Sequence, residues 1–194
     1  HADLTLYDFS GALLTNSKLV EVNLHHTNLR GANLEEAILD RAKLTFAVLE
    51  GANLSGVRGS QAFFYAIHAT GAVFSHADLM LAAFNHAECR DCDFTSAVLS
   101  GAELAESDFT GANLTDAYLE RASIYRTKLD RATLKGCCVH GCCVWNVSLD
   151  GAEDVLGVPQ NFVQDQDAQV PVLGEPPERV CCGDGRGLQM PAGR

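Results

Sequence analysis

Large apolar residues recur at every fifth position of the chain. Counted from Leu4 in steps of five, this register reaches Leu149 without insertion or deletion and holds 30 positions. Only Gly59, Ala69 and Cys89 are small on it. A second register, two residues earlier, carries mostly alanine. A period of five fits neither an α-helix, at 3.6, nor a β-strand, at 2, so the pattern predicts a repeat architecture.

The individual five-residue units resemble those of a known family. Units such as Ala32-Asn33-Leu34, Ala52-Asn53-Leu54 and Ala112-Asn113-Leu114 are similar to the units of pentapeptide-repeat proteins, and the similarity covers residues 2 to about 153. It implies an all-β fold, a right-handed quadrilateral β-helix (pentapeptide-repeat solenoid) with four units per coil. The hand and the square section come from this resemblance, not from the period. Thirty units then make about 7.5 coils, a rod roughly 36 Å long at ~4.8 Å per layer.

Two inward residues in every five predict one continuous core. We number the sides of the coil in chain order. Side one carries Leu4 and every twentieth residue after it, and sides two, three and four follow at five-residue steps. Small residues on the register pair with large ones two places earlier, as in Val57 with Gly59 and Ile67 with Ala69, which we interpret as volume compensation. The residues predicted at the centre of the core are Leu34, Phe64, Phe74, Leu79, Phe84 and Phe94.

The register stops after Ala152, and this divides the chain. We predict a pentapeptide-repeat β-helix over residues 1–152, a C-terminal cap over 153–170 and a flexible tail with Pro and Gly over 171–194. All five prolines lie after the register ends. The segment 144–152 resembles the closing coil of large bacterial pentapeptide-repeat proteins. His1 is already in register and is not Met, which we interpret as a cropped or processed N-terminus.

Composition argues against several classes of ligand. The formal net charge is −11, which disfavours direct binding to nucleic acid or to an anionic membrane. No apolar run is long enough for a transmembrane helix, and we expect a cytoplasmic protein. Of the eight cysteines, Cys89, Cys92, Cys137 and Cys142 fall on inward positions. We interpret the cysteines as plain thiols. The alternative is a disulfide that joins Cys181 or Cys182 to Cys138 or Cys143.

No sequence motif predicts catalysis or a bound cofactor. A straight four-sided rod without inserted loops has no concave pocket in which catalytic groups converge. All seven histidines fall on outward positions, and the neighbours His25 and His26 diverge, so we expect no metal site. No Gly-rich phosphate loop or nucleophile elbow is present. We therefore predict a protein that is not an enzyme and needs no cofactor.

The outward residues divide the rod into two halves. Sides two and three carry most of the net negative charge of the coils. The candidate acidic face consists of Glu35, Glu36, Glu88, Asp91, Asp93, Asp108 and Asp116. Sides four and one are nearly neutral and carry large outward apolar residues, which suggest a partner where they are contiguous. The candidate interface consists of Phe63, Tyr65, Met80 and Leu81.

Two functions are compatible with these surfaces. The first is a non-enzymatic protein-interaction scaffold that binds a protein partner or a second copy through the candidate interface. The open first coil is a competing location for such a contact. The second follows from the family resemblance, because some pentapeptide-repeat proteins mimic DNA and occupy the DNA groove of type II topoisomerases such as DNA gyrase, which gives quinolone resistance. The acidic half of the rod is compatible with that role.

Overall fold

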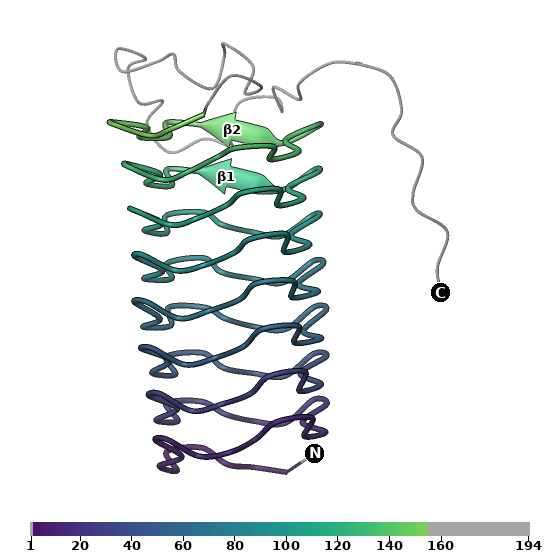
Figure 1. Ribbon diagram of the computed structural model, residues 1–194. Helices are drawn as coiled ribbons and strands as arrows, with labels where there is room; N and C mark the ends of the chain where they lie inside the picture. The colour runs from purple at the N-terminus through teal and green to yellow at the C-terminus, as the bar shows by residue number, and fades with distance from the viewer. Residues whose placement is uncertain (1, 155–194) are drawn as a thin grey trace, which may run out of the picture.

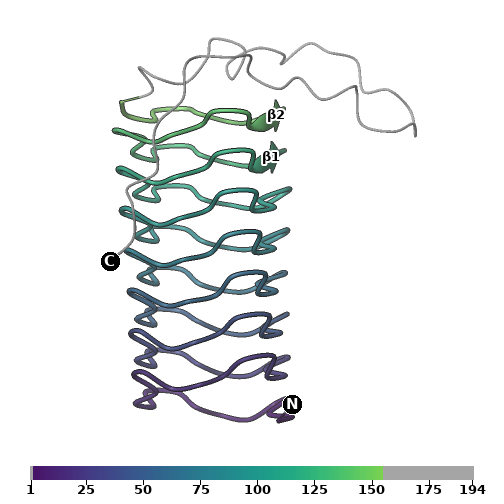
Figure 2. The same cartoon turned by 90° about the vertical axis from the view of Figure 1, so that its right-hand side faces the viewer.

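The computed structural model describes residues 2–154. In this range the chain winds into coils that stack along one straight axis, and the view turned by 90° shows the same rod (Figures 1 and 2). The predicted tail, 171–194, and all but the first two residues of the predicted cap, 153–170, lie outside the described residues. Both segments stay predictions, as does the total of about 7.5 coils.

The coil contains 20 residues and has four sides. Parallel bridges join residues 20 apart, and the first bridge on side one links Asp3 to Asn23. Leu4 N–H donates to Asn23 O at 2.8 Å, and Asn23 N–H donates to Ala2 O at 3.0 Å. Strands β1 (Ser123–Tyr125) and β2 (Cys143–Trp145) are the one place in the described range where this pairing extends over three residues. They are parallel, in the same 20-residue register.

Each corner between two sides is a tight turn with positive φ at its third residue. This holds at every fifth position from Leu6, at 67°, to Gly151, at 67°. In the first of these turns Tyr7 N–H donates to Leu4 O at 3.2 Å, the geometry of a type II turn. Most of these corner residues are not glycine; Phe46, for example, has a φ of 59°. None of them is Val, Ile or Thr, the types for which positive φ costs most. The stacked backbone therefore imposes positive φ at the corner, and glycine only lowers the energetic cost of that conformation.

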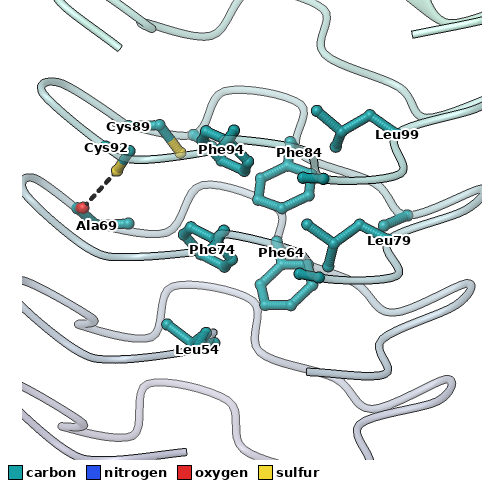
Figure 3. Packing of buried hydrophobic residues seen from close by; sticks show 14 of the residues in the cluster. Leu54, Phe64, Ala69, Phe74, Leu79, Phe84, Cys89, Cys92, Phe94 and Leu99 are labelled. Carbon is teal, nitrogen blue, oxygen red and sulfur yellow. Dashed lines mark hydrogen bonds between the residues drawn. The ribbon is translucent and has the colours of Figure 1, made fainter. Parts of the chain in front are cut away.

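The inward residues form one continuous core that contains stacked rings (Figure 3). Phe64 and Phe84 stack on side one with centroids 4.6 Å apart, and Phe74 and Phe94 stack on side three at 4.8 Å. Phe64 meets Phe74 edge to face at 5.9 Å, and Phe109 adds a fifth ring 5.3 Å from Phe94. The predicted core residues Leu34, Phe64, Phe74, Leu79, Phe84 and Phe94 are all fully buried.

Gly59 is the clearest case of volume compensation in the core. A Cβ atom at this position would lie 3.2 Å from Leu79 Cδ2 in the next coil and 3.7 Å from Phe64 Cε2. Val57, two residues earlier, is fully buried. The larger side chain at 57 and the missing side chain at 59 together fit the space beneath Leu79.

Polar side chains on the inner register bond to the coil below. Thr127 Oγ1 donates to Leu104 O at 2.7 Å. Cys92 Sγ donates to Ala69 O at 2.8 Å (Figure 3). Burial raises the pKa of the Cys137 thiol to about 12 and also raises that of Cys89. No disulfide joins two cysteines within residues 2–154. The cysteines of the alternative disulfide at 181 and 182 lie outside the described residues.

Candidate interaction surface

The four candidate interface residues are all solvent-exposed. Phe63 is 47% exposed and lies in the middle of side one, and Tyr65 lies at the corner that follows. Met80 and Leu81 lie one coil higher, at the corner where side four leads into side one. Phe63 bridges to Ala83, which therefore lies directly above it on the same side. The four side chains thus border one region of side one in two successive coils.

Aromatic rings follow the corner beyond side one from coil to coil. His26 stacks on Phe46 at 4.9 Å, Phe46 meets Tyr65 edge to face at 6.1 Å, and Tyr65 meets His86 at 5.2 Å. Phe46 is 43% exposed and was not among the residues selected from the sequence. Its 20-residue separation from His26 is the signal that could have found it. Because neighbouring rings restrict one another, these side chains would lose little conformational entropy when a partner binds them.

The same corner continues toward β2 through charged groups. His86 Nδ1 lies 3.5 Å from Glu106 Oε2, and Arg126 Nη1 lies 3.7 Å from Glu106 Oε1. The Arg126 guanidinium lies over the rings of Tyr125 and Trp145, at 5.1 and 5.4 Å from their centroids. Those two rings stack at 4.7 Å. The sequence analysis did not predict this cluster.

Further apolar residues are exposed outside the candidate interface. Tyr118 lies on side four above Val98 and is 48% exposed. It adds an exposed ring to side four, two coils above Asp78 in the same column. A separate group lies in the first coil, the competing location for a contact, and it consists of Leu6, Tyr7, Leu13 and Val20.

Some acids of side two lie close to bases. Asp108 Oδ2 lies 2.9 Å from Arg90 Nε and 3.8 Å from Lys128 Nζ. Partial burial raises the pKa of Asp108, but hydrogen bonds from Thr110 and Arg90 outweigh it and hold the pKa below its ordinary value of 3.8. Glu88 Oε2 lies 3.0 Å from His68 Nδ1. Asp108 therefore contributes less to the surface potential than an unpaired carboxylate, whereas His68 offsets the charge of Glu88 only when the imidazole is protonated.

The acids of side three and its corners have no such partners. Within residues 2–154 none of Glu35, Glu36, Asp91, Asp93 and Asp116 takes part in an ion pair. Asp93 Oδ1 accepts hydrogen bonds from the backbone and the hydroxyl of Thr95, at 2.9 and 2.5 Å. The candidate acidic face thus divides into a partly paired region around Asp108 on side two and an unpaired negative region on side three.

Residues 2–154 contain neither a metal-binding cluster nor a membrane-spanning helix. No three side chains of His, Cys, Asp or Glu lie close enough together to hold a metal ion. No helix in this range is long and apolar enough to cross a membrane.

Comparison with known proteins identifies the family. A model of pentapeptide repeats matches in eight copies, over residues 8–45, 17–56, 62–101, 87–124 and 107–146. The chain belongs to the pentapeptide-repeat family. A comparison with curated protein sequences finds no match.

Several solved structures are similar to this chain. The full-length structure of QnrB1, a plasmid-mediated fluoroquinolone resistance protein, is 16% identical and has a TM-score of 0.61, covering 78% of this chain and 82% of that one. This similarity supports a right-handed β-helix. HetL of the cyanobacterium Nostoc, which is involved in heterocyst differentiation regulation, is 23% identical over 77% of this chain and 81% of its own, with a TM-score of 0.27. A pentapeptide-repeat protein from the Arabidopsis thaliana thylakoid lumen is 27% identical over 60% and 67%, with a TM-score of 0.38.

Proposed function

We propose that this protein is a non-enzymatic interaction scaffold that binds another protein through the neutral surface of sides one and four. The observation that carries the proposal is the group of exposed apolar side chains around Phe63, in adjacent coils of a rigid rod. Scattered exposed apolar residues are ordinary on a protein surface, whereas a contiguous patch favours a binding site. Phe46, whose ring contacts that of Tyr65, makes the patch larger than the sequence suggested.

The composition of the patch fits a protein partner. Aromatic residues and Met are enriched at the centres of protein interfaces, where charged residues are depleted. Phe46, Phe63, Tyr65 and Met80 supply these types here. The edge-to-face contact of Phe46 with Tyr65 presents a pre-ordered surface, and pre-ordering lowers the entropic cost of association.

The test replaces Phe63 and Leu81 together by Asp and compares the proteins retained by the immobilised chain. We expect a partner held by the parent to be lost, while circular dichroism and the melting temperature show an intact fold. The matched control, Val73→Asp with His76→Asp, adds the same two carboxylates on side three and should retain the partner. Equal retention by the Phe63/Leu81 variant would exclude the patch as the binding surface.

A second candidate function is DNA mimicry at a type II topoisomerase. Two observations favour it: the unpaired acids of side three and the similarity in fold to a fluoroquinolone resistance protein. The pairing of Asp108 and Glu88 with bases on side two weighs against it. The assay is supercoiling by DNA gyrase, with the triple variant Glu35→Gln, Glu36→Gln, Asp116→Asn as comparison. No inhibition by micromolar parent protein would eliminate this candidate.

A further inference from the structure

The middle of side one is a single column of outward residues that parallel bridges join from Asp3 to Cys143. Its central part is Lys43, Phe63, Ala83 and Glu103, which lie one above the other in that order. Lys43, Phe63 and Glu103 are exposed, and Ala83 is half-buried. These four successive positions therefore run from a base, through a large and a small apolar residue, to an acid.

These four positions are complementary to the same four positions of a second copy that runs in the opposite direction. A two-fold axis that runs along the surface of side one, between Phe63 and Ala83 and perpendicular to the rod, would bring a second copy face to face with its rod antiparallel. Each Phe63 would then face Ala83 of the other copy, a large side chain against a small one. Each Lys43 would face Glu103 of the other copy.

We propose that the apolar surface of side one binds a second copy of this chain in that antiparallel arrangement, with reciprocal Lys43–Glu103 ion pairs flanking reciprocal Phe63–Ala83 contacts. The proposal deepens the proposed function, because it rests on the same surface and names its occupant. A two-fold contact uses one surface twice, so each favourable pair occurs two times in the dimer and the assembly closes at two copies.

The charges of Lys43 and Glu103 are available for such a contact. Within the described residues, neither Lys43 nor Glu103 forms an ion pair. Asn85 Nδ2 donates to Glu103 Oε2 at 2.8 Å, which orients the carboxylate without neutralising it. This differs from Asp108 on side two, whose bases come from its own chain.

The corner before side one shows the same reversal of charge. Glu21 lies in the coil below Arg41, to which it is paired at 2.7 Å, and Arg121 lies four coils above Arg41. The same two-fold axis relates the height of residue 21 to that of residue 121. Glu21 would therefore lie at the level of Arg121 of the second copy, at the rim of the contact. Opposite charges at both ends of the face favour the antiparallel over the parallel arrangement, in which Lys43 would lie level with Lys43.

The test uses two charge-reversal variants that should each associate weakly alone but bind each other when mixed. In sedimentation velocity at low ionic strength, Lys43→Glu and Glu103→Lys should each raise the dimer dissociation constant at least tenfold, since each change alters two contacts. An equimolar mixture of the two variants should recover parental association, because both contacts between positions 43 and 103 in the heterodimer then join an ammonium group to a carboxylate. Lys135→Glu on side three, the matched control, should associate like the parent.

Three results would overturn the proposal. They are a monomeric parent at all concentrations, single variants that associate like the parent, and a mixture that stays as weak as its components. Recovery in the mixture also shows that both variants are folded. A monomeric parent would refute the second copy as occupant but would leave the scaffold proposal standing, because that proposal depends on a partner lost in the Phe63/Leu81 variant.

Discussion

The contact between Gly59 and Leu79 yields a prediction about the coil itself. Leu79→Ala should lower the free energy of unfolding by about 2–5 kcal/mol, because it empties a fully buried site. Gly59→Ala places a methyl group 3.2 Å from Leu79 Cδ2, tighter than an ordinary contact. Overpacking of this kind costs roughly 1–3 kcal/mol, and the reduced entropy of the unfolded chain returns about 0.4–1 kcal/mol. The net change expected for Gly59→Ala alone is destabilising.

The sign should reverse when Leu79 is absent. In the Leu79→Ala background the added methyl at position 59 enters the space that the leucine left, which contributes about 0.8 kcal/mol of burial besides the entropy term. Gly59→Ala should then stabilise by about 1.2–1.8 kcal/mol. The coupling between the two substitutions should be roughly 2–4 kcal/mol, well above the ~0.5 kcal/mol expected for independent sites.

The assay is equilibrium unfolding in urea, followed by circular dichroism, on the parent, the two single variants and the double variant. Thr70→Ala, an exposed change on side two that touches none of these residues, serves as control and should stay within about 0.5 kcal/mol of the parent. Ser55→Ala is a poorer control, because Ser55 Oγ donates to Asn53 Oδ1 at 2.6 Å. Additive effects of the two core substitutions would contradict a 20-residue coil, since residues 59 and 79 meet only in that register.

Three further predictions concern single side chains. Asp108→Asn should destabilise the protein at neutral pH, and the difference from the parent should vanish as the pH falls. A carboxyl group whose pKa is lowered by folding contributes stability that is complete above its ordinary pKa of 3.8 and is lost below it. Urea unfolding across the pH range measures this difference. Cys89 and Cys92 should react with a thiol reagent only after unfolding, because both are buried, burial raises the pKa of Cys89, and the thiolate is the reactive form. Peptide mass spectrometry would reveal any labelling before unfolding. Arg126→Ala should change the fluorescence of Trp145, the only tryptophan, and cost about 0.5–1 kcal/mol, whereas an unchanged spectrum would contradict the cation–π contact.

The inward half of the structure could be predicted in detail, because a period of five assigns each residue to a layer. The stacking of Phe64 on Phe84 follows from a separation of 20 residues on the inner register. The corners were predicted less completely. Glycine at the last place of a unit is typical of positive φ, yet Phe46 adopts it as well. The hydrogen bonds between coils determine that conformation, and the amino-acid type at one position does not report it.

The outward contacts were harder to predict, because the register gives the column of a side chain but not its torsion angles. Phe63, Tyr65, Met80 and Leu81 were selected by size and position, and they are exposed. Phe46 was missed because its partner His26 was considered only as a possible metal ligand beside His25. The stack between Phe46 and His26 depends on the side-chain direction at a corner with positive φ.

Surface charge on a β-helix must be counted by column and not by side. Neighbours along the rod are separated by 20 residues, or by 18 on the diagonal, as Lys128 and Arg90 are from Asp108. Pairs of this kind cancel much of the charge of side two and leave side three as the negative surface. Sides one and three lie on opposite faces of the rod. A second copy bound across side one would therefore leave the acids of side three facing away from the contact on both copies, and the dimer would present two negative surfaces where the single chain presents one.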